Sequence, residues 1–178
     1  INGAVEMSDD ASIEKYCYSD TESNCTSDGG LYQWGEAMQY ASSCNGTGAP
    51  PNDACSSPVQ GICPSGWHIP SHYEYTTLEK NAGSNPGAFP YDESTADWLG
   101  TDEGTNLKVG GSSGFEGLLA GYRDTNGSFS SRGTFAFIWS SLESGTNAWR
   151  RALNSGFATV GRFASDKLYG FSVRCIKD

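Results

Sequence analysis

The stretch from Trp139 to Asp178 constrains the fold most, because its side chains separate into two sets with a period of two. Successive residues of a β-strand point to opposite faces of a sheet. We interpret one set as a structural face and the other as a face that is free to vary. The first set contains Trp149, Arg151, Leu153, Val160 and Arg162, and the second contains Arg150, Ala152, Asn154, Gly161 and Phe163. This arrangement suits a display surface for binding better than an active site.

The length of the chain predicts one domain over residues 1–178. A chain of 178 residues can bury one ordinary core, and no linker or low-complexity tract divides it. The 23 glycines and the hydrophobic content of only 37% indicate a loop-rich domain rather than a helical bundle. Its 5 Trp, 9 Tyr and 8 Phe must then supply much of the core.

The net charge of -10 is unevenly distributed along the chain. Residues 1–103 carry 16 Asp or Glu and 2 Lys or Arg, whereas residues 104–178 carry 5 and 9. An acidic surface repels a polyanion, and the arginines of the second part are spread out, so we expect no nucleic-acid partner. No apolar run is long enough to span a membrane, so we expect no direct membrane insertion by this segment. Because the chain begins at Ile1 without a Met, we expect a signal or anchor outside it.

The six cysteines form an even set in a small polar domain, which indicates disulfides and an oxidising compartment. A zinc site is the alternative, but no two cysteines have the close spacing of a zinc-binding pair, and His68 and His72 have no such pair to complete. Six cysteines can pair in many ways. We expect two local bridges and one that ties the end of the chain to its middle: Cys17–Cys25, Cys44–Cys55 and Cys63–Cys175.

Two helices are predicted. The first follows the Gly29-Gly30 turn, and its apolar residues with helical spacing are Leu31, Trp34, Met38 and Ala41. The second has a stronger start signal, because Ser71 and Glu74 fit a capping box, and it should end near Ala82. The chain then reads as irregular through Gly114. Strand-like segments follow at residues 118–123, 135–141, 148–153, 159–163 and 171–176.

Several motifs resemble the Fibrobacter succinogenes major paralogous domain, and together they cover nearly the whole chain. They are Tyr16-Cys17-Tyr18, Asn24-Cys25, Gly30-Leu31-Tyr32-Gln33-Trp34, Cys63-Pro64-Ser65-Gly66-Trp67-His68-Ile69-Pro70-Ser71, Ala120-Gly121-Tyr122-Arg123, Trp139-Ser140-Ser141 and Gly170-Phe171-Ser172-Val173-Arg174-Cys175. The resemblance implies a C-type lectin-like fold on a secreted or surface-anchored bacterial protein. The expected class is α+β, with two helices packed on a small, twisted, mostly antiparallel sheet, long irregular loops and disulfide staples.

The chain is also similar to the variable proteins of diversity-generating retroelements, whose diversified residues lie near the C-terminus. In those systems miscopied adenines change AAY codons to many others, but never to Lys, Glu, Gln, Met or Trp. The resemblance implies a variable ligand-binding segment at residues 139–170. Its expected binding positions all carry residues reachable from AAY: Leu142, Ser144, Gly145, Arg150, Ala152, Asn154, Ser155, Gly156, Phe157, Gly161, Phe163, Ala164, Ser165, Asp166, Leu168 and Tyr169. An ordinary solvated strand face is the alternative interpretation of these positions.

Sugar-binding C-type lectins hold calcium through Glu-Pro-Asn or Gln-Pro-Asp triplets followed by Trp-Asn-Asp, and none of these triplets is present. We therefore expect no cofactor, although a structural calcium ion could be held among the acidic residues Asp92, Glu93, Asp97, Asp102 and Glu103. We also expect no enzyme, because no serine has a local context that would activate it as a nucleophile. Formylglycine-generating enzymes of related fold need a reactive cysteine pair near the C-terminus, where only Cys175 lies.

The sequence thus predicts an extracellular or cell-surface receptor or adhesin domain that binds an unknown protein or cell-surface ligand. Exposed aromatics and arginine are the residue types enriched at binding hot spots. The alternatives are a structural pilin-like or adhesin subunit with a fixed surface and, third, a degenerate enzyme of the formylglycine-generating type.

Overall fold

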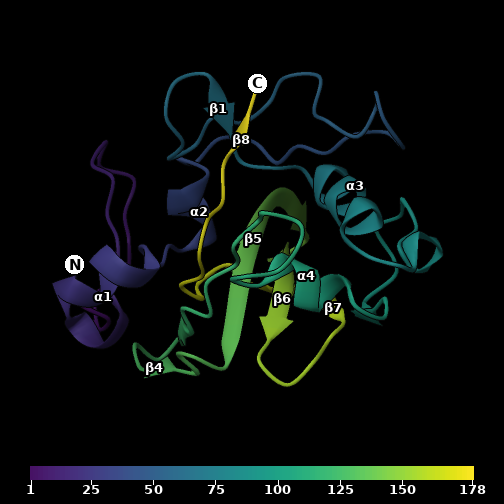
Figure 1. The fold of residues 1–178 in the computed structure, drawn as a ribbon. Helices are drawn as coiled ribbons and strands as arrows, with labels where there is room; N and C mark the ends of the chain where they lie inside the picture. Colours follow the sequence, from purple (N-terminus) through teal and green to yellow (C-terminus); the bar gives the residue numbers. More distant parts are fainter.

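The computed structural model describes residues 1–178 as an α+β structure with short helices and three small antiparallel sheets (Figure 1). The helices are α1 (Glu22–Asp28), α2 (Trp34–Ala37), α3 (His72–Ala82) and α4 (Glu103–Leu107), with 3-10 turns η1 (Tyr18–Asp20) and η2 (Pro86–Ala88). The strands are β1 (Trp67–His68), β2 (Asp97–Leu99), β3 (Tyr122–Arg123), β4 (Phe129–Ser130), β5 (Phe135–Ser144), β6 (Asn147–Asn154), β7 (Val160–Asp166) and β8 (Ile176–Lys177).

The largest sheet has four antiparallel strands in the order β2, β7, β6, β5. Strands β5 and β6 form a hairpin across Gly145, whose φ of 62° is a left-handed conformation that glycine adopts without strain. The register shifts between Trp139 and Glu143, so β5 carries a bulge at this end. The strands predicted at 135–141, 148–153 and 159–163 correspond to β5, β6 and β7, which confirms them.

Helix α3 packs on one face of this sheet. It begins as predicted: Ser71 Oγ accepts a hydrogen bond from Glu74 N at 3.0 Å, and Glu74 Oε2 accepts one from Ser71 N at 2.7 Å. Tyr75 of the helix joins a core cluster with Ile138 and Leu153 from the sheet. Burying an apolar side chain of this size stabilises the fold by roughly 1.5–3 kcal/mol. The capping box therefore sets where the helix starts, and the cluster holds it on the sheet.

A second core cluster lies where the N-terminal half meets the end of the chain. Trp34, Trp139 and Phe171 belong to it. Each indole N–H finds a backbone acceptor at 2.8 Å, Trp34 on Ser140 and Trp139 on Tyr32. Each of these two hydrogen bonds thus joins residues more than a hundred positions apart in the sequence.

The two-stranded sheet of β1 and β8 closes the fold. Figure 1 shows the C-terminal segment, in yellow, leading up to β8 beside β1. The disulfide Cys63–Cys175 lies close by in sequence and spans 112 residues. The two local bridges are Cys17–Cys25 and Cys44–Cys55, so all three predicted pairings are confirmed. No helix is long and apolar enough to cross a membrane.

The first predicted helix is much shorter than expected. Only Trp34–Ala37 is helical, because Leu31 pairs with Tyr16 in an isolated β-bridge and the backbone turns to positive φ at Gln39 and Tyr40. Helix α1 was not predicted. The expectation of two helices is therefore wrong in number, since four short α-helices are present, of which α3 is the longest.

Two strand predictions and the prediction of one irregular stretch also need correction. The strand expected over 118–123 is reduced to β3, and the one expected over 171–176 is reduced to β8 and to single bridges at Phe171 and Ser172. Strand β2 lies in the stretch expected to be irregular. Its three residues pair with β7, so a strand partner rather than local composition defines it.

Candidate functional site

The register of the sheet confirms that Arg150, Ala152 and Asn154 share one face. They lie opposite Phe163, Gly161 and, on β5, Phe135, whereas Arg151 lies opposite Arg162 on the other face. The expectation that this set projects outward is nevertheless wrong for two of its members, because Ala152 is 0% and Asn154 7% exposed. Two other expected binding positions, Leu142 and Gly161, are buried as well.

Aromatic rings cover the small residues of this face. A Cβ added to Gly161 would lie 3.0 Å from the Phe163 ring, 3.2 Å from the Trp98 ring and 2.9 Å from the Ala152 Cβ. Asn154 turns inward for another reason: its Oδ1 accepts a hydrogen bond from Gly156 N at 2.7 Å and closes the β6–β7 turn. Strand alternation assigns a residue to a face, but it does not show what lies over that face.

Apart from Arg150, the other expected positions fall into three places. Ser144 and Gly145 are exposed on the β5–β6 turn. Ser155, Gly156 and Phe157 are exposed on the β6–β7 turn at the other end of the sheet, where Phe157 packs edge-on against Trp98 at 4.9 Å. The remaining positions follow the half of β7 nearest the first turn and the loop after it: Phe163, Ala164, Ser165, Asp166, Leu168 and Tyr169. Leu168 and Phe157 are each 48% exposed.

A hollow of about 260 Å³ lies against this face of the sheet, and we call it the aromatic hollow. It is lined by Tyr122, Ser131, Phe135, Phe137, Arg150, Ser165, Tyr169 and Phe171. Two pairs of its rings are stacked, Phe135 with Phe137 at 5.3 Å and Tyr169 with Phe171 at 5.4 Å. The hollow therefore gathers three of the expected binding positions, Arg150, Ser165 and Tyr169.

Sequence reasoning missed the aromatic walls of the hollow. Tyr122 lies on β3, Phe135 and Phe137 lie on β5, and Phe171 lies in the final segment. A usable signal was present, because Phe135 and Phe137 alternate with Ala136 and Ile138 on a predicted strand. The partner strand of β5 had to be known before these rings could be placed beside Arg150.

Arg150 has no acidic partner. Its guanidinium lies 4.3 Å from the Phe137 ring centroid and 5.4 Å from that of Phe163, and its Nε donates to Ser165 Oγ at 2.8 Å. Its Nη1 is buried without a hydrogen-bond partner. Burial lowers the pKa of Arg150 to about 10, so the side chain is still cationic at neutral pH. The aromatic hollow therefore contains an uncompensated positive charge.

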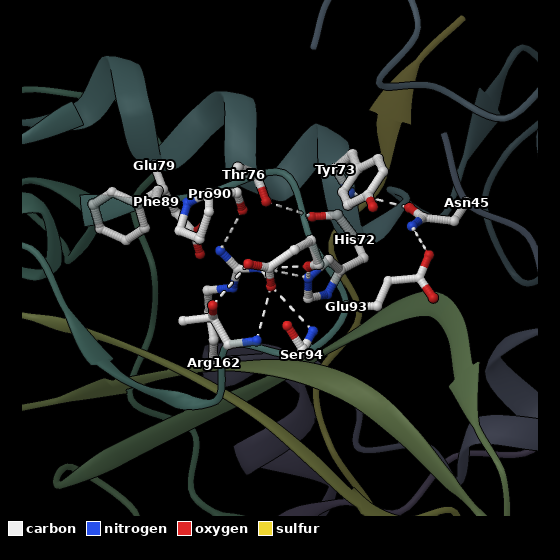
Figure 2. Close-up of polar contacts among 12 residues, drawn as sticks. Asn45, His72, Tyr73, Thr76, Glu79, Phe89, Pro90, Glu93, Ser94 and Arg162 are labelled. Atoms are coloured by element: carbon white, nitrogen blue, oxygen red, sulfur yellow. Dashed lines mark hydrogen bonds and ion pairs between the residues drawn. The ribbon is translucent and has the colours of Figure 1, made fainter. Parts of the chain in front are cut away.

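The opposite face of the sheet holds two arginines whose charges are compensated. Arg151 Nε donates to Glu79 Oε1, and its Nη2 donates to His72 O at 2.8 Å. Arg162 Nη1 donates to Pro90 O at 2.9 Å, and its Nη2 donates to Asp92 O at 2.9 Å. Figure 2 shows Arg162 beneath helix α3 with the His72 ring beside its guanidinium, and Thr76 and Glu79 on the same helix. This network ties the helix to β6 and β7.

His72 lies neutral between these two cations. Arg151 Nη1 is 3.1 Å from its Nδ1, and Arg162 Nη2 is 2.7 Å from its Nε2. A guanidinium only donates hydrogen bonds, so a ring nitrogen must accept. Burial, Arg151 and Arg162 together lower the pKa of His72 far below its usual range. Burial raises the pKa of Glu79, and the charges of Arg151 and Arg162 oppose that rise.

The acidic residues considered for calcium do not converge on one site. Asp92 accepts from Ser94 N and Thr95 N at 3.0 and 2.8 Å, and Asp102 accepts from Ser84 N at 2.7 Å. The one group of three Cys, His, Asp or Glu ligand atoms close together is Cys17, Glu22 and Cys25, where both sulfurs are joined in a disulfide. The Asp92 carboxylate thus orders its own loop, and the Asp102 carboxylate ties its loop to Ser84.

Comparison with known families gives one match. Residues 3–177 match the Fibrobacter succinogenes major domain. Neither the curated proteins nor the solved structures give a match. The matched range covers nearly the whole chain and includes the disulfides, both faces of the sheet and the aromatic hollow. The chain therefore belongs to the Fibrobacter succinogenes major domain family.

Proposed function

We propose that this chain is an extracellular bacterial binding domain that holds a protein or cell-surface partner without a chemical step. The partner lies on the face of the sheet that carries Arg150, which we call the open face because α3 packs on the other one. The observation that carries the proposal is the aromatic hollow, where Arg150 lacks an acidic partner and large rings are half-buried. Aromatics and arginine supply much of the free energy of binding at protein interfaces. Three disulfides support export, because such bridges persist in oxidising compartments.

We further propose a C-type lectin-like fold for the domain. Support comes from the combination of a small antiparallel sheet, few helices and long loops, and from the β1–β8 pairing that brings the end of the chain back to its middle. In such an arrangement the sheet is a rigid platform, and the turns and loops beside it supply contacts.

The variable-protein role is part of the proposal, with residues 139–170 as the diversified segment. The exposed and half-buried positions can accept new side chains without disturbing the core. Ala152 and Gly161 have no such freedom, because a larger side chain at Gly161 would meet Ala152, Phe163 and Trp98. We therefore expect diversity at Arg150, Phe157, Ser165, Leu168 and Tyr169 and restriction to small residues at the two covered positions.

Deep sequencing of the 3′ end of this gene, with its flanking DNA, in the source population tests the role. Substitutions concentrated at these codons and matched to adenines of a nearby template repeat would support it. A uniform segment without a repeat would overturn it. The burial of Leu142, Ala152, Asn154 and Gly161 favours the alternative in that case, a pilin-like or adhesin subunit whose fixed surface contacts its own assembly.

A further inference from the structure

We propose that the aromatic hollow binds a monocarboxylate carried on a single six-membered ring, with Arg150 holding the carboxylate and the aromatic walls holding the ring. The inference rests on the proposed binding function and names the ligand class for this sequence. Its starting point is the contrast between the filled hydrogen-bonding positions of Arg151 and the empty ones of its neighbour Arg150.

The charge argument comes first. Arg150 takes part in no salt bridge, and its Nη1 is buried and unpartnered, whereas Nε is held by Ser165 Oγ at 2.8 Å. A buried donor without an acceptor is unfavourable, and more so when the group is charged. Nη2 also makes no hydrogen bond and, unlike Nη1, is not fully buried, so a carboxylate oxygen there would neutralise the cation through a charge-assisted hydrogen bond. Arg150 is thus preorganised for an anion, because packing on Phe137 and the bond to Ser165 fix its side chain.

The walls indicate what carries the anion. The Tyr122 ring packs edge-on against the Phe137 and Tyr169 rings, with centroid distances of 5.3 and 6.0 Å. These rings line the hollow and leave its centre empty. The face of an aromatic side chain can stack on an aromatic ligand ring or on the C–H face of a sugar ring. A volume of about 260 Å³ is small for a ligand site, so it fits one ring rather than a chain of them.

A single negative charge fits better than two. Arg150 is the one cation lining the hollow, and the chain carries a net charge of -10. Burial raises the pKa of Tyr169, and the nearby carboxylates Asp124 and Asp166 raise it further. Those carboxylates would repel a phosphate dianion more strongly than a carboxylate. The chemistry therefore selects a monoanion, whose ring can come from an aryl acid or from a uronic acid.

The experiment is a ligand titration of the full chain by calorimetry and saturation-transfer NMR, at low ionic strength. The probes are benzoate and methyl glucuronide, each paired with its neutral counterpart, benzamide and methyl glucoside. We expect at least one acid to bind and its neutral counterpart to bind about 10-fold or more weakly, since a charge-assisted hydrogen bond contributes about 1.5–3 kcal/mol. Binding of benzoate alone identifies an aryl acid, and binding of the glucuronide alone identifies a sugar acid.

Two variants locate the site. Arg150→Met should lose about 10-fold or more in affinity for the acid that binds. Arg174→Met is the matched control, because Arg174 also lies over a phenylalanine, with 5.2 Å to the Phe115 ring centroid, but is exposed and outside the hollow. It should bind like the parent chain. Equal binding of acid and neutral probes, or unchanged binding by Arg150→Met, would overturn the inference.

Failure of this inference and failure of the proposed function are distinguishable. A diversified gene whose product binds neither acid retains the binding function and loses the ligand class. A uniform gene whose product binds an acid through Arg150 loses the variable role and retains the site. A folded chain that binds neither acid contradicts the ligand class directly, and its near-ultraviolet circular dichroism checks that it is folded.

Discussion

Neighbouring arginines on β6 lie in opposite surroundings on the two faces of the sheet. Arg151, on the face beneath α3, has Glu79 and the His72 carbonyl as acceptors, and Arg162 beside it reaches Pro90 and Asp92. Arg150, on the other face, has aromatic rings and one serine. The closed face, beneath α3, gives each arginine an acidic neighbour, with Glu79 bonded to Arg151 and Asp92 Oδ1 4.0 Å from Arg162, although Arg162 Nε is buried without a hydrogen-bond partner. The open face, which carries Arg150, gives that arginine no acidic neighbour. Neighbouring residues of one strand therefore serve stability on one face and, in the binding role proposed above, recognition on the other.

Removal of the buried carboxylate should have the largest effect. Glu79→Gln leaves Arg151 cationic and without an anion in a site where Glu79 is 1% exposed. We expect a loss of roughly 3–5 kcal/mol in the free energy of unfolding, measured by urea denaturation with the disulfides intact. Glu143→Gln, which breaks the exposed pair with Lys167, is the control and should cost less than about 1 kcal/mol. Equal losses in the two variants would mean that Arg151 does not depend on Glu79.

The closed face should also make stability depend on pH. His72 has a pKa below its ordinary value of 6.5 in the folded chain, so below that pH the unfolded chain takes up a proton that the folded chain does not. The free energy of unfolding therefore falls as the pH falls, by an amount approaching about 1.4 kcal/mol per pH unit.

Comparison with the His72→Gln variant isolates the contribution of His72 protonation to the pH dependence of stability. Between pH 5.5 and 4.5 we expect the parent chain to lose about 1 kcal/mol more than the variant, because the variant has no imidazole to protonate. Urea midpoints at several pH values provide the measurement. Parallel pH profiles for the two proteins would show that His72 is protonated in the folded chain, contrary to its position between two guanidinium groups.

Replacement of the unmatched arginine should have the smallest effect on stability. Arg150→Met removes a cation–π contact with Phe137 and the bond to Ser165, but it also removes the cost of a buried donor without an acceptor. We expect the free energy of unfolding to change by less than about 1 kcal/mol in either direction. A loss as large as that of Glu79→Gln would place Arg150 among the structural residues and erase the difference between the faces.

Local chemistry explains which parts of the fold could be predicted. The Ser71–Glu74 capping box identified the start of α3, and the alternation around Arg151 identified the two faces of β6. Helix α2 and strand β2 could not be predicted in this way. Leu31 has helical spacing yet pairs with Tyr16, and β2 exists because β7 lies beside it. Tertiary partners outweigh local propensity in such short elements.

The candidate site was predicted only in outline. Arg150, Ser165 and Tyr169 were among the expected binding positions, and they line one hollow. Ala152 and Asn154 were assigned to the correct face but are covered, because Trp98 and Phe163 close over the middle of the sheet and Asn154 caps a turn. Period alone separates the faces of a strand, whereas coverage depends on side chains contributed by other strands.

The bridge between Cys63 and Cys175 has a mechanical consequence. The four-stranded sheet and the aromatic hollow lie within the 112 residues that this bridge closes into a covalent ring. A pulling force applied to the two ends of the chain is transmitted through the sulfur–sulfur bond, so strands β5 to β7 do not carry it. The aromatic hollow would keep its shape under tension for as long as the bond stays oxidised.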